Sequence, residues 1–131
     1  MIRCAAVLAA CLFFAAPALA QHAPPPKLTV LIKDAAVTGA RDKVFVMATA
    51  EWAPGAATGR HTHPGDEYGT VVEGTVITRQ GEGEWRTVEA GQNYYVPAGI
   101  IHETKNAGDK PARTYNAWIA EKGKPLATPA P

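Results

Sequence analysis

Cysteine is scarce in this chain: of 131 residues only Cys4 and Cys11 are cysteines, and both lie among the first twenty. The sequence also lacks a repeat at solenoid spacing and a long run of one charge, which excludes repeat proteins and charged tails. Lysine and arginine number 13 against 12 aspartates and glutamates, so the net charge is only +1. Without a basic excess, we expect no binding to nucleic acid or to an anionic membrane surface.

The first twenty residues have the three parts of a secretory signal peptide. Arg3 carries a positive charge, residues 5–16 are almost wholly apolar, and Ala-Leu-Ala at 18–20 is a small-x-small cleavage site. The apolar run is shorter than the roughly 20 residues that span a bilayer. Residues 8–11 also resemble a lipoprotein signal, which is the alternative. We therefore predict an exported protein, periplasmic or secreted, with no membrane attachment after cleavage.

Cleavage would leave residues 21–131, which contain no cysteine and carry equal numbers of acidic and basic side chains. A cysteine nucleophile, a cysteine-ligated zinc site and a disulfide are then excluded, so the fold must be stable through core packing alone. A chain of about 110 residues can bury roughly two thirds of its unfolded surface, which is enough for one core.

The remaining sequence has the pattern of strands and turns, without a convincing amphipathic helix. Short β-rich runs recur every eight to twelve residues or so, separated by glycine and proline, which is typical of an all-β sandwich or barrel. We divide the chain into a signal peptide (1–20), an N-terminal tail with the first strand (21–40), one domain (41–121) and a loose C-terminal tail (122–131). The predicted strands are residues 28–33, 43–52, 68–80 (divided by Gly74), 85–88, 93–96, 100–105 and 113–121.

Three histidines and a glutamate are the candidate chemical groups. His61 and His63 are two residues apart, so in an extended strand they face the same side. Glu67 follows a Pro-Gly-Asp turn that can fold it back toward them, and His102 comes just after a Pro-Ala-Gly turn. Neutral imidazoles with a carboxylate suit a divalent transition metal. Two exposed histidines would be the alternative reading of the His-x-His pair alone.

These residues belong to two longer patterns. The first comprises Gly55, His61, His63, Glu67 and Gly74, and the second comprises Gly91, Pro97, Gly99, His102 and Asn106. The spacings within both patterns resemble the two motifs of the cupin superfamily at every defined position. The resemblance covers about residues 44–121 and identifies the chain as a small single-domain cupin. It implies a single cupin jelly-roll β-barrel, with 41–121 as the cupin domain.

The resemblance further implies that His61, His63, Glu67 and His102 bind one metal ion inside the barrel, with Asn106 as a turn residue. Four protein ligands leave two positions on an octahedral ion but none on a tetrahedral zinc. We therefore expect one divalent transition metal per chain, iron, manganese, nickel or cobalt before zinc. One carboxylate against a 2+ ion leaves a local charge near +1, which favours a small anionic or enolisable molecule as the ligand or substrate.

The cavity walls and flanking residues are less defined by the sequence. Gly69 would either widen the cavity or mark a kink in its strand. Arg60 and Asp66 would either orient a substrate or be surface charges. Some aromatic or flexible strand residues would line the pocket while most would be core, and either tyrosine among them could act as an acid or base; the candidates are Tyr94, Tyr95, Trp118 and Met47.

Two classes of function stay open. One is a metal-dependent enzyme of the dioxygenase, isomerase or lyase type, and the other is a protein that binds or senses a small molecule without turnover. The intact ligand set favours the enzyme. The resemblance also implies a homodimer, through sheet packing or exchange of residues 28–33, unless that segment pairs within its own barrel.

Overall fold

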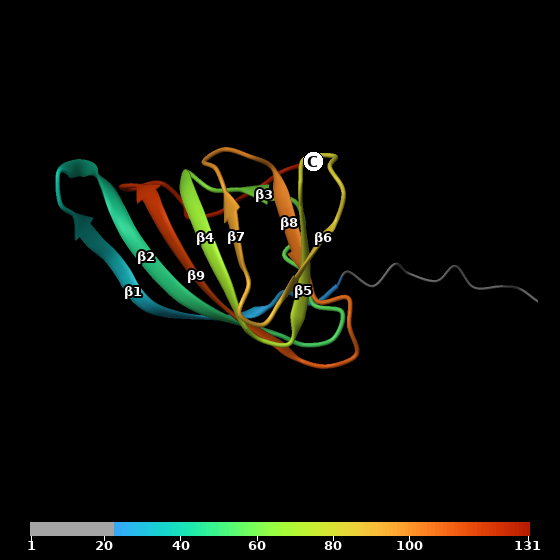
Figure 1. Ribbon diagram of the computed structural model, residues 1–131. Helices are drawn as coiled ribbons and strands as arrows, with labels where there is room; N and C mark the ends of the chain where they lie inside the picture. Colours follow the sequence, from blue (N-terminus) through green and yellow to red (C-terminus); the bar gives the residue numbers. More distant parts are fainter. Residues whose placement is uncertain (1–22) are drawn as a thin grey trace, which may run out of the picture.

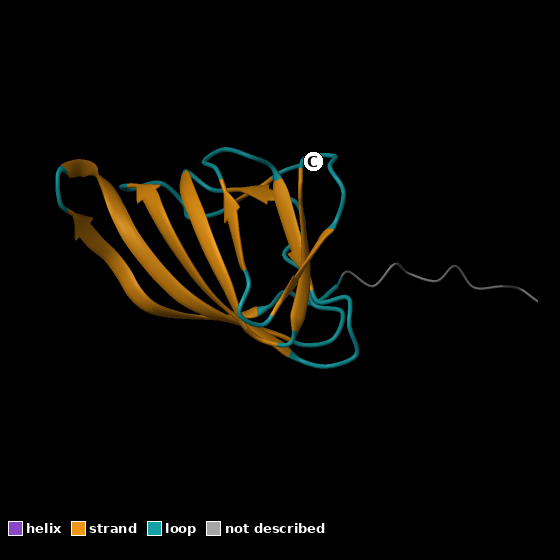
Figure 2. Cartoon of the chain, viewed as in Figure 1, coloured by secondary structure: helices purple, strands orange, loops and turns teal. Residues whose placement is uncertain are grey.

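The computed structural model describes residues 23–131. The predicted signal peptide, both cysteines and His22 lie outside the described residues. The described part is all-β: ten strands form two five-stranded sheets (Figures 1 and 2). The strands are β1 (Lys27–Val37), β2 (Ala40–Trp52), β3 (His61–Thr62), β4 (Gly65–Glu73), β5 (Thr75–Gln80), β6 (Arg86–Glu89), β7 (Asn93–Val96), β8 (His102–Lys105), β9 (Ala112–Glu121) and β10 (Thr128–Pro129).

The first sheet has the order β1-β2-β9-β4-β7, and every neighbouring pair in it is antiparallel. Side chains in its long strands alternate between the two faces, as an extended chain requires. In β2 every second residue from Val44 to Trp52 is buried. In β9 every second residue from Ala112 to Ala120 is buried as well. One face of this sheet therefore forms the wall of the interior.

The second sheet has the order β10-β3-β8-β5-β6 and faces the first. Core side chains fill the space between the sheets, with Val71, Val76 and Val88 fully buried beside Trp52. The strands β1 and β2 extend beyond the second sheet, at the far left of Figure 1, so the barrel is not closed there. Two facing antiparallel sheets confirm the predicted all-β jelly-roll class. No helix within residues 23–131 is long and apolar enough to cross a membrane.

Most predicted strands are confirmed to within a few residues, and residues 93–96 agree at both ends with β7. The first strand runs to Val37, which is longer than predicted. The predicted turn glycines Gly55, Gly74, Gly91 and Gly99 all have positive φ, between 71° and 87°, where a side chain would be strained.

The prediction of a loose C-terminal tail is wrong. Its last residues form β10, which pairs with β3 through Thr128 and Pro129. The amide of Ala130 donates to the carbonyl of Arg60 at 3.0 Å, and Leu126 packs on the core cluster around Trp118. Proline and alanine suggested disorder, but an edge strand tolerates a proline whose missing amide faces away from its partner.

Gly69 in β4 pairs with Tyr94 in β7, and the ring of Tyr94 lies over it. A Cβ at Gly69 would lie 2.1 Å from Cζ of Tyr94, well inside van der Waals contact. The pairing of β4 with β9 is regular at this point. Both interpretations of Gly69 from the sequence are therefore wrong: the glycine neither kinks the strand nor widens the cavity. It makes room for a buried tyrosine.

Replacing Gly69→Ala should therefore lower the free energy of unfolding by about 1–3 kcal/mol, since the added methyl overpacks a filled site. Urea denaturation of the two proteins measures the difference. Gly108→Ala is the matched control, because its Cβ would only reach 3.4 Å from Asn106 Oδ1. Equal stability of the two variants would contradict the close approach of the Tyr94 ring.

Candidate metal centre

The four predicted site residues come from three strands and one turn, and they meet between the sheets. His61 in β3 lies directly across from His102 in β8. His63 follows β3 where the chain crosses from the second sheet to the first, and Glu67 lies in β4. The crossing ends at Gly65, where a Cβ would lie 1.9 Å from the carbonyl oxygen of Ile119. Only glycine fits there, so Gly65 allows β4 to pack against β9.

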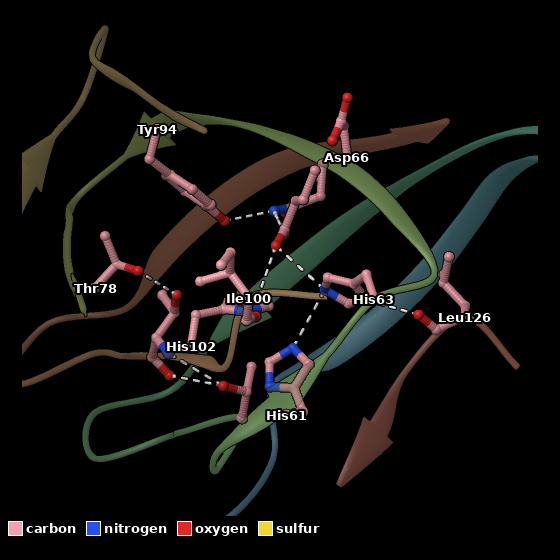
Figure 3. A network of polar contacts seen from close by, with 12 residues as sticks. His61, His63, Asp66, Thr78, Tyr94, Ile100, His102 and Leu126 are labelled. Carbon is pink, nitrogen blue, oxygen red and sulfur yellow. Dashed lines mark hydrogen bonds and ion pairs between the residues drawn. The ribbon is translucent and has the colours of Figure 1, made fainter. Parts of the chain in front are cut away.

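The ring and carboxylate atoms of these residues converge on one point (Figure 3). His61 Nε2 lies 3.3 Å from His63 Nε2. Oε2 of Glu67 lies 3.2 Å from His63 Nε2 and 3.0 Å from His102 Nε2. The three imidazoles offer nitrogens within 4.8 Å of one another, an arrangement that could hold a metal ion.

Each of the three imidazoles is anchored through its other nitrogen to a main-chain carbonyl. A carbonyl oxygen only accepts, so each Nδ1 carries a proton, and Nε2 is the nitrogen left to face the centre. The main chain thus selects the tautomer that faces the centre. The three pairs are His61 Nδ1 with Gly59 O at 2.9 Å, His63 Nδ1 with Leu126 O at 2.6 Å, and His102 Nδ1 with Ile100 O at 3.0 Å.

Electrostatics keep these groups in the states that bind metals. Burial raises the pKa of Glu67, but hydrogen bonds and charge from His102 and His63 outweigh it and bring the pKa to about 2. Burial lowers the pKa of His61, and the neighbouring imidazoles add to this effect against the Gly59 carbonyl. Near neutral pH the carboxyl is therefore ionised and His61 is neutral.

The centre opens into a cavity of about 360 Å³ with mostly apolar walls. Tyr94 and Trp118 line it, whereas Tyr95 is 46% exposed and Met47 lies outside it. Burial also raises the pKa of Tyr94, so its hydroxyl keeps its proton and does not suit the role of a base. The sequence had left all four as candidates for the wall.

The flanking charges have separate roles. Arg60 lines the cavity and pairs with Glu82 at 2.7 Å. Asp66 accepts from the amide of Ala98 at 3.0 Å and points away from the histidines in Figure 3. Asn106 organises a turn, as predicted, by accepting from the amide of Gly108.

Sequence reasoning missed a buried polar group on β9. Thr114 and Asn116 are 0% and 4% exposed, and Asn116 Nδ2 donates to Glu67 Oε1 at 2.8 Å. The available signal was two polar residues at alternate positions on the inward face of a strand whose other inward residues, Ala112, Trp118 and Ala120, are apolar.

Curated proteins from plants and bacteria resemble parts of this chain. A germin-like protein 5-1 from Oryza sativa is 35% identical over 80 residues, covering 57% of this chain and 36% of its own length. The β-alanine degradation protein BauB from Pseudomonas aeruginosa is 42% identical over 71 residues, covering 50% and 73%. The transcriptional regulator PuuR from Escherichia coli is 35% identical over 69 residues, covering 52% and 37%. The chain thus spans about a third of the length of the germin-like protein.

Solved structures share the fold. An uncharacterised protein with a double-stranded β-helix domain from Klebsiella pneumoniae superposes with a TM-score of 0.64 at 23% identity, covering 79% of this chain and 85% of the other. The DMSP lyase DddQ from Ruegeria pomeroyi gives 0.66 at 17% identity, covering 81% and 52%. The family model of the cupin domain matches residues 48–118. The chain therefore belongs to the cupin family.

Proposed function

We propose that His61, His63, Glu67 and His102 together bind one divalent transition metal ion. The observation that carries this proposal is the convergence of three imidazole nitrogens, within 4.8 Å of one another, and one carboxylate oxygen. The pairs His61–His63, His63–Glu67 and His102–Glu67 are 3.0–3.3 Å apart. With metal–ligand bonds of about 2.1 Å, neighbouring ligands stand about 3 Å apart. These three separations therefore match the spacing of neighbouring ligands around one metal ion. Nitrogen and oxygen donors with no sulfur suit iron, manganese, nickel, cobalt or zinc.

The cavity supports a small molecule as the partner of this metal. Its volume lies at the low end of the range for ligand pockets. Arg60 adds a guanidinium group to the wall, partly neutralised by Glu82 at 2.7 Å, and its buried Nε has no hydrogen-bond partner within the described part of the chain. A metal with one carboxylate ligand and a nearby guanidinium favour an anionic or enolisable substrate.

We assign to the protein a metal-dependent enzyme activity of the dioxygenase, isomerase or lyase type on such a molecule. A bound divalent ion would supply Lewis acidity or, in the case of iron, oxygen chemistry. The chain's own groups hold this site ordered and largely buried: His63, Glu67 and His102 are at most 6% exposed. Trp52 and Trp118 add apolar surface to the cavity wall.

The alternative is a protein that binds or senses a small molecule without converting it. The match to the regulator PuuR over 69 residues favours this reading, since that protein is named for regulation rather than catalysis. Incubation of the metal-loaded protein with a diketone or an enolic acid separates the two. Product formation supports the enzyme, and saturable binding without product supports the sensor.

Export completes the proposal. Signal cleavage after residue 20 would place the mature protein, residues 21–131, in a periplasm or outside the cell. Copper and zinc compete strongly for nitrogen sites there. The metal found in a purified sample need then not be the one that supports activity.

The homodimer also stays a prediction. β1 pairs with β2 of its own chain, so the described fold does not exchange this strand. Its apolar side chains nevertheless are 39–52% exposed, at Leu28, Val30, Leu31 and Ile32. Light scattering after size exclusion should give a dimer for residues 21–131 and a monomer once residues 21–33 are removed. A monomer in both samples would contradict the dimer.

Metal content tests the proposed centre. We expect about one ion per chain in residues 21–131 refolded with iron, manganese, nickel or zinc, since one cluster of donors serves one ion. The His61→Ala, His102→Ala double variant should retain none, as measured by elemental analysis. A parent protein without metal under all four conditions would contradict the proposal and leave the histidines as pocket residues of a binding protein.

The C-terminal tail should support the same site. Deleting residues 123–131 removes the carbonyl that holds His63 Nδ1, and the loss of such a partner typically weakens metal binding by about 10–100-fold. Titration with a competing chelator measures the dissociation constant. Leu126→Ala keeps the carbonyl and should stay close to the parent. A truncated chain with the parent's metal affinity would show that the tail does not position His63.

A further inference from the structure

A chain of buried hydrogen bonds leads to the carboxylate oxygen of Glu67 that faces away from the histidines. Trp52 Nε1 donates to Thr114 Oγ1 at 3.1 Å, and Thr114 Oγ1 donates to Asn116 Oδ1 at 2.6 Å. Asn116 Nδ2 then donates to Glu67 Oε1 at 2.8 Å. All four residues are at most 5% exposed. Water therefore does not compete for these groups.

The direction of this chain is fixed by its first member. An indole N–H can only donate, so the hydroxyl of Thr114 must accept from Trp52. Its single hydrogen is then free to go to the amide oxygen of Asn116. With the oxygen so engaged, the amide must turn its NH₂ group toward Glu67. A flipped amide would place its oxygen against Glu67 Oε1 with no hydrogen between them. It would also leave the hydroxyl hydrogen of Thr114 without an acceptor.

The second amide hydrogen of Asn116 is engaged as well. It is donated to the hydroxyl oxygen of Tyr94, whose ring occupies the space that Gly69 leaves. The amide is thus held at its oxygen and at both hydrogens. One oxygen of Glu67 is consequently occupied by Asn116, and only Oε2 lies against His63 and His102.

We propose that Trp52, Thr114 and Asn116 are positioning residues that make Glu67 a one-oxygen ligand of the metal. This inference rests on the metal centre proposed above. A carboxylate without the Asn116 hydrogen bond can rotate and offer both oxygens to the ion. Holding Oε1 back leaves a coordination position for an incoming ligand, so the chain of hydrogen bonds keeps the site open as well as ordered.

Thr114→Val tests the proposal because it keeps the shape of the side chain and breaks the hydrogen-bond chain in the middle. We expect the Mn²⁺ dissociation constant of residues 21–131 to rise about tenfold or more, and Thr114→Ser to restore it. The matched control is Thr78→Val, a buried threonine whose hydroxyl bonds Thr104 and the Glu103 carbonyl and does not reach Glu67. Thr78→Val should leave Mn²⁺ affinity close to the parent.

Two further measurements guard against a purely structural effect. The thermal midpoints of the metal-free Thr114→Val and Thr78→Val proteins should fall together, since each loses buried hydrogen bonds. Trp52→Phe keeps an aromatic ring but removes the donor, and should weaken Mn²⁺ binding without adding to the effect of Thr114→Val. This variant also serves if Thr114→Val does not fold.

The outcomes separate this inference from the metal centre itself. A parent that binds none of manganese, iron, nickel and zinc contradicts both; if it binds another of these ions in place of Mn²⁺, the same variants are titrated with that ion. A parent that binds Mn²⁺, with Thr114→Val and Trp52→Phe no weaker than Thr78→Val, contradicts the positioning role alone. In the visible spectrum of the Co²⁺-loaded proteins, a changed ligand field in Thr114→Val and an unchanged one in Thr78→Val would support it.

Discussion

Three hydrogen bonds from imidazole nitrogens to main-chain carbonyls are the constraint on which the site depends. They hold a proton on Nδ1 of His61, His63 and His102, and so direct every Nε2 toward the same point. The acceptors belong to the backbone near β3, near β8 and in the C-terminal tail. Because a carbonyl cannot change its role from acceptor to donor, the choice of Nε2 as the nitrogen that faces the centre is a consequence of the fold.

The two sheets divide the work of building this centre. The second sheet supplies His61 and His102 as direct neighbours across β3 and β8. The first sheet supplies Glu67 and, one strand away, Asn116 that holds it. One small residue allows the two sheets to meet. Gly65 lets β4 pack against β9 after the crossing, and a methyl group at this position would overlap the backbone. The packing of the sheets thus sets the geometry of the ligands.

Much of this could be predicted from the sequence, for identifiable reasons. Alternation with a period of two predicted the strands, and the spacing of His61, His63, Glu67 and His102 resembled a known pair of motifs. What escaped prediction depends on contacts distant in the sequence. The polar pair Thr114–Asn116 looks like any strand interior until Trp52 and Glu67 are brought beside it. The tail looked loose because its strand is only two residues long and its hydrogen bond to the metal centre comes from one main-chain carbonyl, that of Leu126.

The most direct test of this account is the nitrogen chemistry of the three imidazoles in zinc-loaded protein, with zinc as a diamagnetic probe. Long-range ¹H–¹⁵N NMR distinguishes a protonated nitrogen from a metal-bound one in each ring. The account predicts that His61, His63 and His102 all keep the proton on Nδ1 and bind zinc through Nε2. A ring that binds through Nδ1, or one of the three that zinc leaves unchanged, would contradict it.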